Sequence, residues 1–429
     1  SLTPAHGIWC KSCLTGPADA DPTESEGSTI MTNETHRLGG IDSHKDTIHV
    51  AVITGVGQPV ADREFPTTLA GYRRAVAWLI EHGPLHAVGV EGTSSYGVGI
   101  TTELLAAGLR VVEVNRTRPA EKRKQGKSDP LDAYRAARSV LSGEASTEPK
   151  NPSIEPLRAL TIARRSAVKA QQATWRQINA LLVNTQPVLR DRYRDLPAAK
   201  LLAVLHDCRP DQIRDLDLAD TMAALRTLAR RHHTLQAEIE DLEQRMRRRA
   251  TEANPALMAI NGVGPAVGAQ LLITAGDNPQ RLRSSASFAA LCGTAPIPVC
   301  SGKTSRHRLS RGGDRQANAA LHHIVKVRMS HDPRTRAYRD ARLAKGWTKK
   351  AVFRALKRAV AREVFHALAG HTTAPDYSDL RPARRAKNLT LTQAAEHLGV
   401  WPARIGELEL GRRPNQELAA RYRAWLTAA

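Results

Sequence analysis

The chain has 429 residues and a formal net charge of +21, with 63 Lys and Arg against 42 Asp and Glu. This length predicts two to four domains, and 41% hydrophobic residues are enough to build their cores. A strongly basic chain favours a polyanionic partner, either nucleic acid or a membrane surface. The sequence contains no apolar run of about 18 residues and no basic amphipathic helix with an aromatic face, which argues against a membrane and favours nucleic acid.

Cysteine usage and the start of the chain indicate a cellular setting. Five cysteines are odd in number and sparse, which argues against a disulfide framework and predicts a reducing cytoplasm. Residues 1–35 hold a lone pair, Cys10 and Cys13, and no apolar stretch typical of a secretory signal. We expect this segment to be a disordered leader without a zinc site.

Residues 36–145 are predicted to form an α/β domain with a mixed sheet, because strand and helix patterns alternate there. The expected strands are 37–56, which ends near a turn, 60–66, 87–90 and 110–114, and the expected helices are 69–82, 98–107 and one that opens at Asp129. We expect the first two strands to pair as a hairpin. Residues 116–128 are expected to form a basic loop.

The remainder of the chain is predicted to be mostly helical. The expected parts are a helical or coiled-coil region at 146–253, a helical domain at 254–370 with a Pro-rich loop at 295–303, a linker at 371–387 and a small module at 388–429. Apolar residues spaced alternately by three and four form a seam: Leu225, Leu228, His232, Leu235, Ile239, Leu242 and Met246. The seam fits a helical hairpin within one subunit as well as a coiled coil between subunits.

Four acidic residues in the α/β region indicate a metal site. Asp42 and Glu91 lie on expected strands that the pattern places side by side, and Asp129 and Asp132 lie three residues apart on one helix face. Converging carboxylates repel one another unless cations lie between them, and Mg²⁺ takes carboxylate oxygens, waters and phosphate. Two such ions about 4 Å apart can activate the attacking oxygen and stabilise the leaving oxygen of a phosphodiester.

The same acids have an explanation without metal. Asp129 before Pro130 fits a helix N-cap, and Asp132 would then interact favourably with the helix dipole. Asp42 and Glu91 would be solvated strand ends. The residues that follow the first acid are expected at the surface of the strand end: His44, Lys45 and Asp46.

Two glycine motifs lie in the helical domain. Gly262 and Gly264 separate two expected helices within 256–277, similar to a helix-hairpin-helix, in which the second helix N-terminus offers free N–H groups to a phosphate. An ordinary Gly-rich helix corner is the alternative. Gly302, Lys303 and Thr304 imitate the end of a P-loop, but Ile297 stands where that loop needs glycine, so we exclude an ATPase.

Ser301 stands beside this glycine among basic residues. A serine hydroxyl is a poor nucleophile until a neighbouring group lowers its pKa or takes its proton. Metal or guanidinium groups would do so and would stabilise a pentavalent phosphate, but the motif by itself also fits a turn serine. The neighbouring residues expected to contact nucleic acid are Lys303, Arg306, Arg308 and Arg311.

The segments GIDSHKDT, VEGTSSYG and KSDPLDAYRAAR resemble the RuvC-like DEDD domain of the IS110 family of insertion-sequence transposases, which includes Piv/MooV-type DNA invertases. Residues from about 257 to 330 are similar to the second domain of that family, with Ser301 at its serine–glycine position, so the resemblance covers roughly 36–370. It implies an RNase H-like fold at 36–145, Mg²⁺ held by the four acids, and a serine that forms a covalent link to the 5′ phosphate of DNA.

The resemblance also implies a bacterial protein associated with the nucleoid, and it implies the partners. It points to a homodimer or homotetramer acting on donor and target DNA, with a noncoding bridge RNA that selects both by base pairing, as in other guided systems. Arg-rich helices and the basic loop would then face nucleic-acid phosphates. The loop residues predicted to do so are Arg116, Arg118, Lys122, Arg123, Lys124 and Lys127.

Residues 388–429 resemble a helix-turn-helix of the repressor type. Thr392–Leu398 would be the first helix, Gly399 the turn and Pro402–Leu410 the recognition helix. A small helical bundle for protein contacts is the alternative. The residues expected at DNA are Arg404 and Glu407 on bases and Arg412 and Arg413 on phosphates.

We therefore predict a DNA transposase or site-specific recombinase with a composite site, in which Ser301 attacks a phosphate held over the acidic quartet. Two alternatives remain. One is a metal-only RuvC-like nuclease or resolvase in which Ser301 is structural, and the other is a helix-turn-helix regulator with a decayed catalytic domain.

Overall fold

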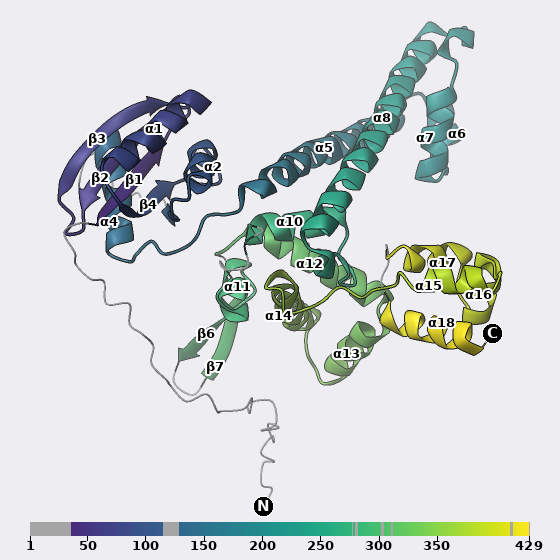
Figure 1. Ribbon diagram of the computed structural model, residues 1–429. Helices are drawn as coiled ribbons and strands as arrows, with labels where there is room; N and C mark the ends of the chain where they lie inside the picture. The colour runs from purple at the N-terminus through teal and green to yellow at the C-terminus, as the bar shows by residue number, and fades with distance from the viewer. Residues whose placement is uncertain are drawn as a thin grey trace, which may run out of the picture.

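The computed structural model describes residues 36–114, 128–276, 278, 282–301, 304–309, 312–411 and 415–428, with the side chains of 298–301 and 304–309 left out. The expected leader at 1–35 and almost all of the basic loop lie outside these residues. An α/β domain comes first, followed by a long helical arm, a helical domain at the base of the arm, and a C-terminal helical module (Figure 1). No helix in the described ranges is both long enough and apolar enough to cross a membrane.

Five strands of the described chain form one mixed sheet in the order β3–β2–β1–β4–β5. They are β1 (Arg37–Ser43), β2 (Thr47–Thr54), β3 (Pro59–Pro66), β4 (Leu85–Glu91) and β5 (Val111–Val114). β2 is antiparallel to β1 and β3, whereas β1, β4 and β5 are parallel to one another. The C-terminal ends of β1 and β4 therefore meet at the same end of the sheet.

The prediction of a single strand over 37–56 was wrong. The chain turns back after Ser43, where the His44 amide donates to the Thr47 carbonyl oxygen at 3.0 Å, and two strands result. The alternation of apolar residues in β2 was misleading because its intervening His49 and Ala51 are buried as well. Both faces of this sheet are covered, so burial does not alternate along its central strands.

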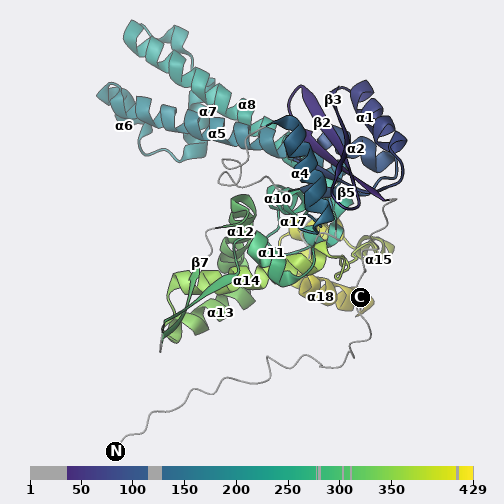
Figure 2. The same ribbon diagram turned by 90° about the vertical axis from the view of Figure 1, so that its left-hand side faces the viewer.

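Helices cover the two faces of the sheet. α1 (Leu69–Glu81) and α2 (Val98–Ala106) pack through Leu79 and Leu104 against one face, in a core shared with β1, β2 and β4. α4 (Asp129–Leu141) crosses the other face, where its Ala137 packs with residues of β1 and β2 (Figure 2). The domain thus has three layers with the sheet in the middle.

The arm is an antiparallel helical hairpin of α5 (Glu155–Asn184) and α8 (Leu216–Ala253), with α6 (Pro187–Tyr193) and α7 (Ala198–Asp207) at its far end. Short 3₁₀ turns, η2 (Pro152–Ile154) and η3 (Pro210–Gln212), precede the two long helices. The predicted seam of α8 faces this hairpin, since Leu225, Ile239 and Met246 are buried within the chain. Of the two expected arrangements, the structure therefore has the hairpin within one subunit.

The helical domain is built around α10. Its helices are α9 (Pro255–Met258), α10 (Pro265–Ala275), α11 (Ser285–Leu291), α12 (Arg315–His331), α13 (Pro333–Ala344) and α14 (Lys349–Leu368). Every residue of α10 from Val267 to Ala275 is buried, and α5, α8 and α12 pack around it.

A two-stranded ribbon of β6 (Pro296–Ser301) and β7 (Thr304–Leu309) stands between α11 and α12. The prediction of a Pro-rich loop at 295–303 was therefore wrong over most of its length. Proline lacks the N–H that a central strand needs. A two-stranded ribbon tolerates Pro296 and Pro298 because, among the residues that the structure describes, one edge of each strand has no partner strand.

The C-terminal module has its own core, formed by α15 (Leu380–Ala386), α16 (Leu391–Leu398), α17 (Pro402–Glu409) and α18 (Gln416–Ala428). The two helices expected here agree with α16 and α17 to within one residue at each end. α15 falls in the range expected to be a linker, and its Leu380 and Arg384 are buried in the module.

A buried ion pair holds the C-terminal module together. Arg384 donates to both carboxylate oxygens of Glu409 at 2.7 and 2.9 Å, and the Tyr422 hydroxyl donates to Glu409 at 2.8 Å. Burial acts to raise the pKa of Glu409, but these hydrogen bonds outweigh it and lower the pKa. The carboxylate is therefore charged inside the core and ties α15, α17 and α18 to one another.

Candidate active site

Asp42 and Glu91 lie at the ends of adjacent parallel strands. Ile41 of β1 pairs with Val90 of β4, so the two acids take the next position on each strand. Side chains alternate between the faces of a sheet, and Ile41 and Val90 belong to the core beneath α1 and α2. Asp42, which is 5% exposed, and Glu91 therefore belong to the face that α4 covers.

Asp129 and Asp132 lie in the first turn of α4. Ser128, not Asp129, is the N-cap residue, and the Asp132 amide donates to the Ser128 carbonyl oxygen at 3.1 Å. The explanation of Asp129 as a capping residue was therefore wrong. Asp132 is buried and forms an ion pair with Arg135 one turn later, a partner that the sequence prediction missed.

Two glycines determine how closely α4 approaches the sheet. Gly40 and Gly89 each stand two residues before an acid, on the same face of the sheet. A Cβ on Gly40 would lie 2.1 Å from the Ala133 carbonyl oxygen and 2.4 Å from the Ala137 nitrogen, and one on Gly89 would lie 2.7 Å from the Ala136 carbonyl oxygen. Only glycine allows the backbone of α4 to contact the strands so closely, which brings the first turn of α4 to the strand ends.

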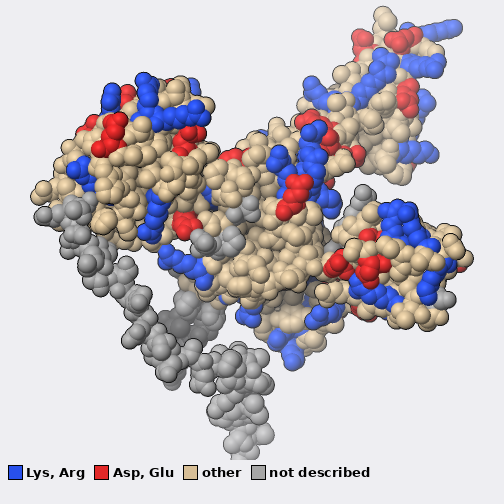
Figure 3. Space-filling view, viewed as in Figure 1, with Lys and Arg blue, Asp and Glu red and all other residues tan. Residues whose placement is uncertain are grey.

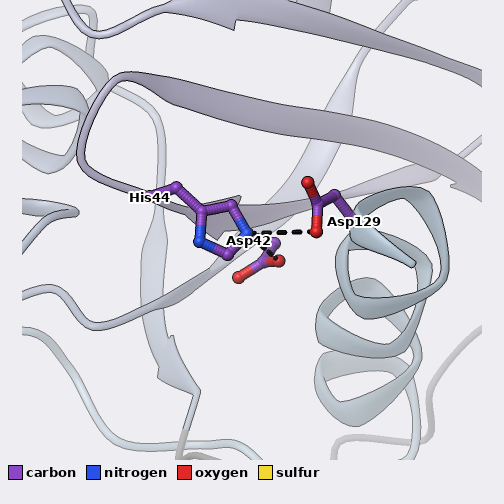
Figure 4. Close-up of side chains that lie close together, drawn as sticks. All are labelled: Asp42, His44 and Asp129. Carbon is purple, nitrogen blue, oxygen red and sulfur yellow. Dashed lines mark ion pairs between the residues drawn. The ribbon is translucent and has the colours of Figure 1, made fainter. Parts of the chain in front are cut away.

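His44 joins the acids of the strand and the helix (Figure 4). Its Nε2 lies 3.0 Å from Asp42 Oδ2 and 3.2 Å from Asp129 Oδ1, and the three side chains offer ligand atoms within 4.8 Å of one another. The expectation of surface residues holds for Lys45 and Asp46, and the His44 side chain is 37% exposed as well, but its contacts with the two acids were not predicted. The available signal was its place two residues after Asp42, at the start of the turn.

This donor set fits a hard divalent cation. The carboxylates of Asp42 and Asp129 suit Mg²⁺ and Mn²⁺ equally. The imidazole of His44 is a ligand that transition metals accept. The Asp42 side chain is 8% exposed but that of Asp129 is 41% exposed, which leaves access for waters or phosphate oxygens. Glu91 and Asp132 belong to the neighbouring strand end and helix turn but not to this group of three.

Hydrogen bonds hold the strand ends in place around Asp42. The Ser43 hydroxyl donates to the main-chain oxygen of Glu91 at 2.7 Å. His49, opposite Asp42 on β2, lies 2.7 Å from Asp62, which also accepts from the Tyr134 hydroxyl of α4 at 2.9 Å. The hydrogen bond with His49 lowers the pKa of Asp62, and burial with the bond to Asp62 raises the pKa of Tyr134 to about 12.

Ser301 lies in a different part of the chain. It is the last residue of β6 and pairs with Thr304 at the end of the ribbon. In both views the ribbon projects from the helical domain and lies apart from the sheet (Figures 1 and 2). The structure thus brings Asp42 and Asp129 together but does not bring Ser301 to them within one chain.

The predicted nucleic-acid contacts are described only in part. Gly262 has a positive φ of 87° and packs against Ile324, so the fold itself requires this glycine, whereas Gly264 is the N-cap of α10 and faces open space. Arg404 and Glu407 lie half-buried on α17. The candidates outside the described side chains are Arg116, Arg118, Lys122, Arg123, Lys124, Lys127, Lys303, Arg306, Arg308, Arg311, Arg412 and Arg413. On the face shown in Figure 3, Lys and Arg occur on the α/β domain, the arm and the C-terminal module, with Asp and Glu among them, while the middle of the face carries few charges.

Sequence similarity agrees with this arrangement. Residues 39–187 match the DEDD domain of IS110-type elements, described as a transposase, and residues 254–340 match the transposase IS116/IS110/IS902 family. The first match holds all four acids and the second holds Ser301. Together the two matches cover more than half of the chain.

Two proteins of Streptomyces coelicolor are similar to this chain. A 43.6 kDa protein of the insertion element IS110 is 32% identical over 136 residues, which span 31% of this chain and 32% of that protein. A protein named for transposition of the IS117 mini-circle is 23% identical over 347 residues, which span 66% of this chain and 83% of that protein. Both domain matches and both relatives point to one group, and the chain belongs to the IS110 family of transposases.

Proposed function

We propose that the protein cleaves and rejoins DNA strands at a composite site made by the α/β domain and the serine ribbon. The observation that carries this proposal is the convergence of Asp42, His44 and Asp129 at the C-terminal ends of parallel strands. Glu91 and Asp132 adjoin this group, and together the four acids form the quartet. The sheet order, with α4 across one face, supports an RNase H-like, RuvC-like fold for residues 36–145.

The chain prepares the acidic half of this site for a divalent cation, for which we propose Mg²⁺. When bound, Mg²⁺ supplies positive charge that stabilises the phosphate as it reacts. Burial and strand pairing fix Asp42, the contact of α4 with the sheet fixes Asp129, and His44 bridges the two. Arg135 balances the charge of the buried Asp132.

Ser301 supplies the nucleophile in this proposal. Its Oγ attacks the phosphorus and gives up its proton to a base, the bond from phosphorus to the 3′ oxygen breaks, and that oxygen leaves as a hydroxyl after taking up a proton. The 5′ phosphate remains esterified to serine. A 3′ hydroxyl of another strand then attacks the phosphoserine and releases the serine, so the energy of the bond is kept and no ATP is needed.

The separation of the ribbon from the sheet supports a site completed by a second subunit. Ser301 ends a ribbon that projects from the helical domain, and such a projection can reach the acids of a partner in a homodimer or homotetramer. The other parts serve nucleic acid in this proposal. The spread of positive charge favours donor and target DNA and a noncoding guide RNA, and the module of α15 to α18 acts as a helix-turn-helix, with Gly399 in the left-handed conformation at its turn.

Two variants of the full-length protein test this proposal. Ser301→Ala and Asp42→Asn are each expected to bind DNA and to form no denaturant-resistant protein–DNA adduct on a nicked substrate, whereas the unmodified protein forms one. A mixture of the two variants should recover adduct formation, because a mixed oligomer contains one intact serine and one intact acidic group facing each other.

The alternative outcomes are distinct. Full recombination by Ser301→Ala would refute the covalent route and favour the metal-only nuclease, whose supporting observation is the group of Asp42, His44 and Asp129 within the α/β domain alone. A mixture that stays inactive, although mixed oligomers form, would place both halves of the site in one subunit and require the domains to close.

A further inference from the structure

A basic cavity lies between α12 and α14, away from the acidic group. Its volume is about 400 Å³, which falls in the range of small-molecule sites. Four of its six lining residues are Lys or Arg and none is acidic. The six are His322, Lys349, Lys350, Phe353, Arg354 and Lys357.

The cavity offers a flat aromatic surface. The rings of His322 and Phe353 stack with centroids 4.8 Å apart and planes 21° from parallel. Phe353 is partly buried against the domain core. Desolvation is the main cause that lowers the pKa of His322, and the positive charges of Lys357 and Lys326 lower it further. The ring is therefore neutral near pH 7. A neutral aromatic plane is a surface on which a nucleic-acid base can stack.

Hydrogen bonds connect the inner wall of the cavity to the segment that leads into the serine ribbon. Lys357 is 9% exposed, and its Nζ donates to Asn318 Oδ1 at 2.7 Å. Asn318 in turn donates to the main-chain oxygens of Cys292 and Gly293, at 2.8 and 3.2 Å. These two residues follow α11 and lead into β6. The cavity therefore lies at the foot of the ribbon that carries Ser301.

We propose that this cavity binds one unpaired nucleotide of a single-stranded nucleic acid, with its base on the His322–Phe353 pair and its phosphates on Lys349, Lys350 and Arg354. The inference rests on the proposed function in one respect, that the ligand is a nucleic acid. A base inside a duplex is already stacked and paired and cannot enter a concave site. Binding of inorganic phosphate would not require the aromatic pair. Cations beside a stacking surface are typical of single-strand binding.

The cavity is placed so that a bound nucleotide can direct its strand toward Ser301. Ser301 is the last of the six residues of β6, so at about 3.4 Å per residue it lies roughly 17 Å from the first residue of the strand, at the foot of the ribbon. A nucleic-acid strand with one nucleotide bound in the cavity would run along the ribbon toward Ser301. The cavity thus positions a strand rather than taking part in the chemistry.

Binding of labelled oligonucleotides to the full-length protein, without divalent metal, tests this proposal. The probes are a single-stranded DNA and a single-stranded RNA that carry 2-aminopurine, and a duplex of the same length. Phe353→Leu keeps an apolar side chain but removes one of the two stacking rings. It should weaken single-strand binding on the order of tenfold and reduce the quenching of 2-aminopurine, whereas Phe353→Tyr should restore both.

Salt dependence separates the phosphate contacts from general attraction to a basic protein. Lys350→Gln should reduce the slope of log affinity against log salt by about 0.7 for a single strand. Lys345→Gln removes the same charge from an exposed position at the end of α13, outside the cavity, and should leave the slope unchanged.

The outcomes are decisive for the cavity and independent of the serine chemistry. Dependence on Phe353 in either single-stranded arm supports the proposal, and that arm identifies the strand as DNA or RNA. Equal affinity and quenching for Phe353→Leu and the unmodified protein, or an equal loss with the duplex, would overturn it. Failure of adduct formation with single-strand binding still dependent on Phe353 would reject the covalent mechanism alone.

Discussion

Replacing Gly40 by alanine tests whether the contact of α4 with the sheet positions the acids. The new Cβ would lie 2.1 Å from the backbone oxygen of Ala133, where contacts under 3.0 Å are essentially never observed. Backbone atoms cannot rotate away, so α4 must move outward by about 1 Å. Asp129 moves with the helix, while Asp42 and His44 stay with the strand and its turn. The ligand atoms that now lie within 4.8 Å of one another would separate.

Two magnitudes follow from this displacement. Overpacking of a tight contact costs about 1–3 kcal/mol of the free energy of unfolding. Mg²⁺ requires nearly ideal geometry with ligands at about 2.0–2.1 Å, so a shift of this size should weaken metal binding by at least about tenfold. Thermal unfolding measures the first effect. Calorimetric titration with Mg²⁺ and Mn²⁺ measures the second.

A graded series of glycine substitutions makes the test specific. Gly89→Ala places its Cβ 2.7 Å from the Ala136 backbone oxygen and should have a smaller effect than Gly40→Ala. Gly406 lies on α17, and a Cβ there would lie 3.8 Å from its nearest neighbour, the side chain of Leu391. The variant Gly406→Ala should therefore bind metal normally. Unchanged metal affinity and melting temperature in folded Gly40→Ala would refute the reasoning. Should that variant fail to fold, an effect of Gly89→Ala no larger than that of Gly406→Ala would refute it instead.

Three further predictions concern other residues. His44→Ala should weaken Mn²⁺ binding by about tenfold or more, whereas Lys45→Ala at the exposed neighbouring position should not, as measured by electron paramagnetic resonance. Glu409→Gln leaves the buried Arg384 without its counter-charge and should destabilise the C-terminal module by about 3 kcal/mol in denaturant unfolding. The control Asp379→Asn removes the acid of an exposed ion pair and should cost less than about 1 kcal/mol. Hydrogen bonding lowers the pKa of Asp62 below its usual 3.8, so its contribution to stability is complete above about pH 4 and is lost as the pH falls through that lowered pKa. Stability curves from pH 6 to 2 should therefore converge for the unmodified protein and Asp62→Asn, and parallel curves would contradict this.

Local pattern alone predicted much of this molecule. Strand–helix alternation predicted the α/β domain, and the apolar run before Glu91 placed this acid at a strand end, where the structure has it. Asp42 also lies near a strand end, but the predicted strand ran past it to residue 56. The regular spacing on α8 predicted one buried stripe. These features depend on which residues avoid water, and hydrophobic periodicity reports that directly.

The tertiary structure decided which elements pack against these buried faces. Periodicity shows that a stripe is buried but not what buries it, so the choice of α5 as the partner of α8 was open in the sequence. His44 was predicted to be only a surface residue of the strand end, because its contact with Asp129 joins residues that are distant in sequence and forms only when α4 crosses the sheet. The same reason applies to Gly40, whose missing side chain matters only because Ala133 lies against it.

The sequence by itself determined the chemistry available to this transposase: four acids at strand and helix ends, a serine beside glycine, and an excess of positive charge. The tertiary structure decided which of these groups meet. It brought Asp42, His44 and Asp129 together through backbone contact of α4 with β1, and it placed Ser301 at the end of a separate ribbon. Residue types follow from the chain alone, whereas distances between residues far apart in sequence follow only from packing.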